Sequence, residues 1–262
     1  MKNLIIIIAS LFLFSCGKYQ KVLKSNDVNY KYSQAVKYYE KEDYNRALPL
    51  FNELNTVMIG TSKMQDISYY FAYCHYHTGD YISAAYLFKR HLKNYPNSKI
   101  ASECSYMSAY CYYLEAPNYS LDARNTHKAI KEMQRHIDSY PDSDNIMECN
   151  KLIDELRNKL AKKAFENAKQ YFTTEKYKSA IIALENVMID FPSINNREEI
   201  QFLIINSSYL LAVNSIGSKI EERLLSTIDL YQYFKENYPN SVYLKTLSDI
   251  YTASNQLLNK TN

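Results

Sequence analysis

The stretch DYISAAYLFKRHLKNYPNS, residues 80–98, contains the pattern that decides the fold. An Asp-Tyr pair opens it, the small residue Ala84 follows three positions after the tyrosine, and Pro96 lies twelve residues beyond that alanine. Proline lacks a backbone N–H and disfavours helical backbone in the residue before it, so it ends a helix firmly. The stretch therefore predicts a helix that begins at a tight turn and stops before Pro96.

The same spacing recurs along the chain. Aromatic-proline pairs occur at 95–96, 140–141, 191–192 and 238–239. In each pair the proline lies twelve residues after a small residue; these small residues are Ala84, Ala129, Ala180 and Thr227. The Asp/Lys-Tyr-x-x-Ala turn recurs at 43–47, 80–84 and 176–180, and twelve residues before the last residue of each turn lie Ala35, Ala72 and Ala168. A small side chain at a helix crossing lets two helices approach closely. The spacing resembles that of the 34-residue tetratricopeptide repeat, which implies one pair of packed helices per repeat.

These repeats predict an all-α fold, an α-solenoid of five tetratricopeptide-like helix pairs with a C-terminal capping helix. The five pairs are expected at 27–62, 65–98, 102–143, 161–194 and 201–241. Repeats three and five contain roughly eight extra residues each, expected between their helices near 115–119 and 214–218 by comparison with the repeat length. The tail 241–258 is expected to cap the solenoid, because the last repeat would otherwise expose its apolar face.

A long helix is predicted where the repeats lose their regular spacing. Residues 144–172 contain neither Gly nor Pro, and apolar or small residues recur there at helical spacing. Residues 144–160 therefore read as an extension of the first helix of repeat four. This helix is expected to link repeats one to three, residues 27–143, to repeats four and five with the capping helix, residues 161–258.

The N-terminus resembles a bacterial lipoprotein signal. Lys2 precedes an apolar run from Leu4 to Phe14, which is too short for a membrane span of about 20 residues. The following Leu-Phe-Ser-Cys, ending at Cys16, resembles a lipobox, which implies cleavage after residue 15 and acylation of Cys16 with chains such as palmitate. Residues 16–26 would then be a lipidated tether. The alternative is an ordinary signal peptide whose cysteine is incidental.

Composition and motifs favour a protein that binds other proteins over an enzyme. The 31 basic and 28 acidic side chains give a net charge of +3, too little for a nucleic-acid-binding field. No H-E-x-x-H or C-x-x-C motif supports a metal site, and no cluster suggests catalysis or a cofactor. Four cysteines are expected to be buried core thiols, with a disulfide as the alternative: Cys74, Cys104, Cys111 and Cys149.

One set of tyrosines recurs at 37-residue intervals, and we call it the tyrosine ladder. It comprises Tyr32, Tyr39, Tyr69, Tyr73, Tyr76, Tyr106, Tyr110 and Tyr113; Val36 occupies the remaining position. Within each helix these positions lie at i, i+4 and i+7, which is one face. Tyrosine combines a large rigid apolar ring with a hydroxyl, which suits peptide binding. The alternative is that the rings only pack on one another. Repeat four has Phe165, Lys169 and Phe172 at these positions.

The lipobox, five repeats, long linking helix and Tyr-Pro endings together resemble the BamD family of outer-membrane assembly lipoproteins. The resemblance covers the chain from Cys16 to the last helix. It implies a non-catalytic scaffold on the periplasmic face of the outer membrane that binds the periplasmic domains of the central β-barrel assembly subunit, largely through the C-terminal repeats. It also implies that the N-terminal repeats receive unfolded outer-membrane protein segments ending in an aromatic residue. The alternatives are another cell-envelope scaffold lipoprotein, in division, export or polysaccharide assembly, and an enzyme hidden in helices.

Overall fold

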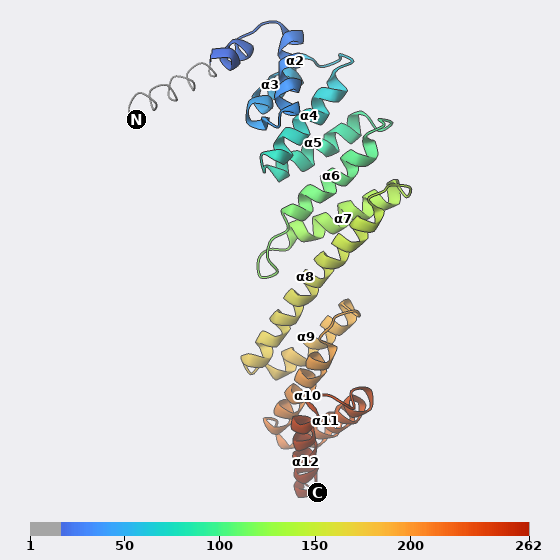
Figure 1. Ribbon diagram of the computed structural model, residues 1–262. Coiled ribbons are helices and arrows are strands. Elements are labelled where there is room, and N and C mark those ends of the chain that lie inside the picture. Colours follow the sequence, from blue (N-terminus) through green and yellow to red (C-terminus); the bar gives the residue numbers. More distant parts are fainter. Residues whose placement is uncertain (1–16, 262) are drawn as a thin grey trace, which may run out of the picture. The chain divides into compact units, whose positions relative to one another are not determined.

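The computed structural model describes residues 17–261, and these residues form helices connected by turns and loops, with no strand among them (Figure 1). The all-α prediction is therefore confirmed. The predicted signal peptide, residues 1–15, and Cys16 lie outside the described residues. The helices are α2 (Val28–Glu40), α3 (Tyr44–Val57), α4 (Met64–His77), α5 (Tyr81–Asn94), α6 (Ala101–Leu114), α7 (Arg124–Ser139), α8 (Ile146–Thr173), α9 (Tyr177–Asp190), α10 (Arg197–Val213), α11 (Gly217–Asn237) and α12 (Leu244–Thr261).

The turns inside repeats one, two and four share one backbone conformation. Glu42, Gly79 and Glu175 all have positive φ, at 59°, 82° and 60°. At each turn this residue and the next donate backbone hydrogen bonds into the preceding helix, as Gly79 does to Tyr76 at 3.1 Å. Glycine adopts this left-handed conformation without a steric penalty, whereas a glutamate does so at some cost. The tight turn predicted from the Tyr-x-x-Ala motif therefore requires one residue with left-handed backbone conformation.

The chain divides into two compact units. Among the described residues, the first unit contains 17–117 and 121–156, and the second contains 118–120 and 157–261. The helix α8 runs through the boundary at 156–157. Within residues 17–261, no helix is both long and apolar enough to cross a membrane.

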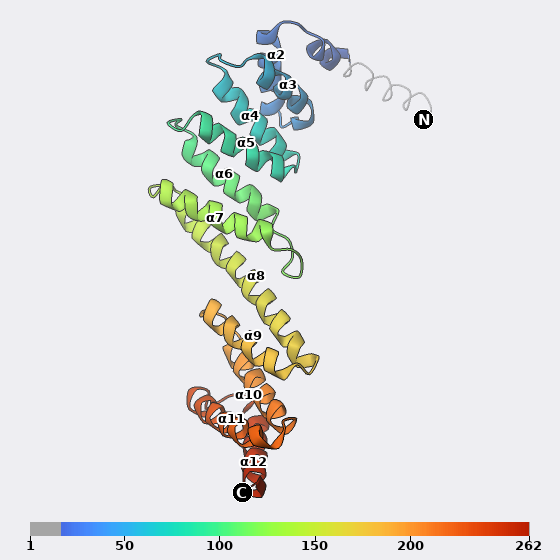
Figure 2. The same cartoon turned by 180° about the vertical axis from the view of Figure 1, so that it is seen from behind.

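In the first unit, each helix from α2 to α7 packs against the next in the sequence, which is how a solenoid is built (Figures 1 and 2). The predicted crossing alanines Ala35, Ala47, Ala72 and Ala84 are completely buried. Proline-terminated helices end where expected, since the last residues of α5 and α7 are Asn94 and Ser139. The extra residues of repeat three form the loop 115–123 between α6 and α7, as predicted.

The four cysteines of this unit are buried and free, which confirms the prediction of core thiols. Burial raises the pKa of the thiols of Cys74, Cys104 and Cys111 to about 12. The Cys149 thiol also has a pKa raised, to about 11, mainly by burial. A thiol that stays protonated at neutral pH is a poor nucleophile and a poor metal ligand, so these cysteines act as small apolar core residues.

The second unit has a more aliphatic core. Its largest completely buried side chains include Leu184, Ile200 and Leu224, together with Phe234. Here α10 packs against α9, α11 and α12, and α12 covers the apolar face that α11 and α10 would otherwise expose. The placement of α12 at the end of the second unit agrees with the expected capping helix.

The prediction of an inserted loop in repeat five is wrong. Only residues 214–216 separate α10 from α11. The extra residues instead lengthen the two helices, to 17 residues in α10 and 21 in α11, against 14 in α9. The segment contains Gly217 as its only helix breaker, and that glycine lies at the first position of α11, so nothing stops either helix earlier.

Residues 17–23, expected only to be part of a tether, form a helix that is docked on repeat one. Val22 is buried with 3% of its surface exposed. The Tyr19 ring packs edge-on against Tyr38 with 5.6 Å between centroids, and its hydroxyl donates a hydrogen bond to the Arg46 carbonyl at 3.2 Å. The Arg46 guanidinium also lies 5.8 Å from the Tyr19 ring centroid. Residues that directly follow Cys16 in the sequence are therefore packed against repeat one.

Candidate functional site

The tyrosine ladder lies on α2, α4 and α6, the first helices of repeats one to three. All eight tyrosines are partly exposed, and all eight pack against the buried core of the first unit. Each ring therefore rests on the core and leaves part of its surface open. Both sequence-based interpretations, peptide binding and packing, are compatible with this placement.

The rings of α4 and α6 form a continuous aromatic surface. Tyr69 and Tyr73 have centroids 4.8 Å apart, and Tyr73 lies 6.2 Å from Tyr76. Tyr76 meets the next helix at Tyr110, 6.5 Å away. On α6, Tyr110 stacks on Tyr106 and on Tyr113, with centroid distances of 5.7 and 5.8 Å and interplanar angles of 17°. A run of rings at these distances offers stacking surface over two repeats.

Carboxylates hold several ladder hydroxyls in place. Tyr69 and Tyr73 both donate a hydrogen bond to Glu103 Oε1, Tyr69 at 2.8 Å. Tyr113 donates to Glu155 Oε2 at 2.8 Å. Burial, followed by the bond to Glu103, raises the pKa of Tyr69 and of Tyr73. The bond to Glu155, followed by burial, raises the pKa of Tyr113 to about 12, so these hydroxyls stay protonated donors at neutral pH.

The ladder tyrosines of repeat one, Tyr32 and Tyr39, make different contacts. Tyr32 is covered by the Lys63 ammonium, which lies 4.9 Å from the ring centroid. Tyr39 contacts Tyr70 at 4.7 Å and Tyr44 at 5.5 Å between ring centroids. Repeat one therefore joins the aromatic surface through Tyr70, which is not a ladder position.

Three residues of this surface were missed by the sequence analysis: Tyr70, His77 and Glu103. Tyr70 bridges Tyr39 to Tyr69, and His77 stacks on Tyr44 with 4.1 Å between centroids and 9° between planes. Glu103 carries a signal that the spacing could have revealed. It lies 30 residues after Tyr73, in the first turn of the next first helix, and an acidic residue recurs in the first turn of α4 and α10.

The fourth repeat has a related contact with a different chemistry. Lys169, at the position that corresponds to Tyr73, binds Glu199 Oε1 at 2.7 Å, again 30 residues further on. The hydrogen bond with Glu199 raises the pKa of Lys169. The ammonium also lies 5.4 Å from the buried Phe165 ring. In both units, the middle ladder position thus ties one first helix to the next through a glutamate.

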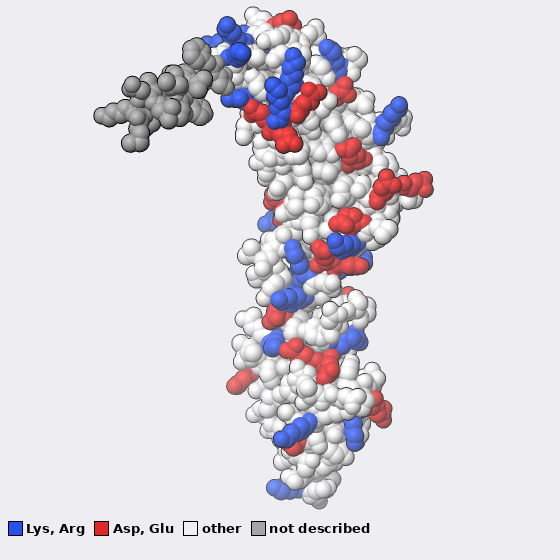
Figure 3. Space-filling model, viewed as in Figure 1, with Lys and Arg blue, Asp and Glu red and all other residues white. Residues whose placement is uncertain are grey.

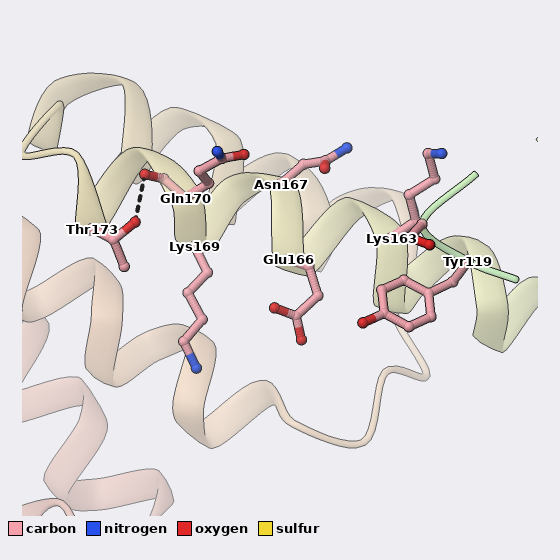
Figure 4. A pocket seen from close by; sticks show the side chains of 8 residues that line it. Tyr119, Lys163, Glu166, Asn167, Lys169, Gln170 and Thr173 are labelled. Atoms are coloured by element: carbon pink, nitrogen blue, oxygen red, sulfur yellow. Dashed lines mark hydrogen bonds between the residues drawn. The ribbon is translucent and has the colours of Figure 1, made fainter. Parts of the chain in front are cut away.

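Polar residues of α8 and of the loop between α6 and α7 line a pocket of about 400 Å³ in the second unit (Figure 4). They include Tyr119, Glu166, Lys169 and Thr173, and the Lys162 ammonium lies 4.4 Å from the Tyr119 ring. Thr173 donates its hydroxyl hydrogen bond to the Gln170 carbonyl at 2.9 Å, so it serves the helix end.

Histidines and carboxylates do not gather into a metal site: residues 17–261 contain no group of three metal-ligating side chains. His91 and His136 are buried at equivalent positions of α5 and α7. His91 Nδ1 lies 2.8 Å from Ser68 Oγ, and His136 Nε2 lies 3.1 Å from Ser143 Oγ. Burial lowers the pKa of both, so both are neutral core residues.

Comparison with known proteins places this helical chain in an envelope context. A family model described as "YfiO: Outer membrane lipoprotein" matches residues 24–224. No curated protein is similar enough in sequence to match the chain. Solved structures similar to it include the TPR2AB-domain:pHSP90 complex of yeast Sti1, with 14% identity, TM-score 0.42 and coverage of 87% of this chain and 98% of that chain. The P58(IPK) TPR domain has 16% identity, TM-score 0.44 and coverage of 93% and 68%. Both likenesses are too distant to indicate a shared function.

Proposed function

The chain belongs to the YfiO family of outer membrane lipoproteins, and we infer from this membership that it is a non-catalytic scaffold of the outer-membrane β-barrel assembly machinery, as the BamD resemblance implies. The observation that carries the inference is the extent of the family match, from residue 24 to residue 224. That range contains repeats one to four and the first helix of repeat five. The resemblance concerns the repeat architecture as a whole, and not a short motif.

Cys16 is the proposed anchor of this scaffold. The match begins eight residues after the lipobox cysteine, so the repeats follow the lipidation site almost directly. Acyl chains on Cys16 would hold the protein at the outer membrane, because each buried CH₂ contributes about 0.8 kcal/mol to membrane binding. We place the repeats on the periplasmic side, where they would bind the periplasmic domains of the central barrel subunit.

The tyrosine ladder is the proposed site for unfolded outer-membrane protein segments. Its rings form a surface of stacking partners across α4 and α6, and Glu103 and Glu155 restrain three of the hydroxyls. Rings that are already held in place lose little conformational freedom on binding, which favours affinity. An extended segment that ends in an aromatic residue would add its own ring to this surface.

Co-purification tests the proposed function. The full-length protein is expressed with an affinity tag in its native organism. Membranes are solubilised in mild detergent, and the proteins that co-purify are identified by mass spectrometry. We expect the central β-barrel assembly subunit to be recovered. A Cys16→Ala variant serves as the control for anchoring, and a wash at high salt is expected to release it from membranes that retain the acylated wild type.

A second candidate, another scaffold lipoprotein of the cell envelope, predicts a different outcome of the same experiment. Recovery of division, export or polysaccharide-assembly proteins without the barrel subunit would favour it. Recovery of the barrel subunit at the level seen with an untagged control would contradict the proposed function.

A further inference from the structure

A small pocket lined by lysines lies between the N-terminal helix, residues 17–23, and α2. Its volume is about 280 Å³, and we call it the lysine pocket. Four of its eight lining residues are lysines and none is acidic; the lining consists of Lys18, Lys21, Val22, Tyr30, Gln34, Lys37, Tyr38 and Lys41. All four lysines are exposed. In the space-filling view, several basic side chains lie over this end of the first unit, with acidic side chains beside them (Figure 3).

Packing contacts between the two helices hold the pocket in shape. Lys18 and Lys21 are three residues apart on one helix, so they share a face of it. Lys37 lies in the last turn of α2, and Lys41, four residues further on, is the C-cap of that helix. The docking of Tyr19 on Tyr38 and the burial of Val22 bring the two helices together. Four positive charges are therefore placed side by side by the fold itself.

None of these four ammonium groups is neutralised within the described chain. Other lysines of the first unit have carboxylate partners, such as Lys31 with Glu53 and Lys89 with Glu132 at 2.7 Å. No ion pair or hydrogen bond joins a lysine of the pocket to any residue of 17–261. Adjacent unpaired cations repel one another, and a phosphate between them would remove that repulsion.

We propose that the lysine pocket binds the phosphate groups of anionic phospholipids in the membrane leaflet that holds the chain. Lys18 lies two residues after Cys16, at most about 7 Å of backbone away. An anchor at Cys16 would hold the Lys18 side chain near the headgroups, where charges closer than the Debye length of about 8 Å at physiological ionic strength are little screened. The proposal rests on the acylation of Cys16, which is part of the proposed function. The pocket would then fix the orientation of the first repeat at the membrane surface, which acyl chains alone do not do.

Vesicle flotation tests the pocket apart from the anchor. The mature chain with Cys16→Ser, which has no acyl chains, is mixed with vesicles of phosphatidylethanolamine alone or with added phosphatidylglycerol. We expect binding only to the anionic vesicles, weakening as salt is added. Changing all four pocket lysines to Gln (K18Q, K21Q, K37Q, K41Q) should abolish it, since each lysine near an anionic surface contributes roughly fivefold in affinity.

A matched control has the same loss of charge elsewhere: K178Q, K235Q, K245Q and K260Q, all exposed lysines of the second unit. This control should keep full binding, and circular dichroism should show both variants folded. Equal binding to neutral vesicles, or equal loss in both variants, would overturn the proposal. Tight calorimetric binding of inorganic phosphate without vesicle binding would overturn the lipid as the source. Mass spectrometry of the wild-type protein decides the acylation of Cys16 separately.

Discussion

The two units of the chain share helix pairs and turns but differ in the side chains at equivalent positions. In the first unit, Tyr69, Tyr73 and Tyr76 line one face of α4; in the second, Phe165, Lys169 and Phe172 stand at the corresponding positions of α8. The aromatic surface with anchored hydroxyls is thus a property of the first unit, although the backbone pattern is common to both. Fold and surface chemistry are specified by different positions of the repeat.

The two units also differ in the contact that joins the first helix of one repeat to the first helix of the next. Tyr73 donates to Glu103 in the first unit, and Lys169 pairs with Glu199 in the second, each across 30 residues. One tie is a hydrogen bond from a neutral group and the other is an ion pair. The same structural task is therefore performed by chemistries that respond differently to salt.

The largest expected effect separates the cores of the two units. Phe51 is completely buried and stacks on Tyr70 with 5.4 Å between centroids. Phe51→Ala should destabilise the first unit by about 3–5 kcal/mol, because a cavity is left under the aromatic surface. Hydrogen exchange with mass spectrometry should show faster exchange in α2 to α4.

The matched variant in the second unit is Leu184→Ala, also completely buried. It should destabilise α9 and α10 by about 2–5 kcal/mol and leave the exchange of α4 unchanged. Identical exchange patterns for the two variants would contradict the division into separate units.

Acid should weaken the first unit before the second. All five histidines lie in the first unit, and burial lowers the pKa of His91 and His136. The unfolded chain takes up protons below about pH 6.5, where the buried rings are still neutral, so their contribution to stability is complete above that pH and falls below it. Urea unfolding of the first unit should give a lower free energy of unfolding at about pH 5.5 than at about pH 7.5; these values lie on either side of the pKa of a histidine in the unfolded chain.

The control for acid sensitivity is a pair of variants. Changing His91 and His136 to Asn should flatten this pH dependence, whereas changing the exposed His127 to Asn should leave it as it is. If the stability of the wild-type first unit does not change over this pH range, the predicted effect of the buried histidines is contradicted.

Removing the two glutamate ties should have smaller effects that salt distinguishes. Tyr73→Phe should cost about 1 kcal/mol, because Glu103 loses one donor and keeps Tyr69. Lys169→Met should cost about 0.5 kcal/mol, since the Lys169–Glu199 pair is partly exposed. Urea titrations at low and high salt should show that only the second effect shrinks with salt. Equal salt dependence of both would mean that the two ties do not differ in chemistry.

An effect of similar size is expected at the turns that the two units share. Glu42 and Glu175 adopt the left-handed conformation that Gly79 adopts in repeat two. Glu42→Gly and Glu175→Gly should therefore each stabilise the respective unit by about 0.5–1 kcal/mol, and Gly79→Ala should destabilise. Thermal unfolding measures all three. Opposite signs for Glu42→Gly and Glu175→Gly would show that the turns are not equivalent.

The repeat pattern predicts the helices well because its signals are local. Alanines at helix crossings and prolines at helix ends act within one helix pair, and both lie where the spacing places them. The inserted loop of repeat five was wrong because a count of extra residues cannot tell a loop from two longer helices. The docked helix 17–23 was missed because its contact, Tyr19 on Tyr38, joins positions that belong to no repeat.

The candidate site was predictable in part. Periodicity finds the eight ladder tyrosines and their common face. It does not find Tyr70 or His77, whose ring contacts depend on how two helices cross. The distinction between binding and packing is also beyond a sequence pattern, because a half-buried ring on the core serves either role.

The central claim is that the first unit, and not the second, binds unfolded barrel-protein segments through its tyrosines. Fluorescence anisotropy with a labelled peptide that ends in an aromatic residue measures this directly. Replacing Tyr73 and Tyr110 by Ala should weaken binding by roughly tenfold or more, as for central aromatic contacts in other interfaces. Replacing Lys169 and Phe172 by Ala should leave the Kd unchanged. An unchanged Kd for the folded tyrosine variant, or an equal loss in both variants, would contradict the account.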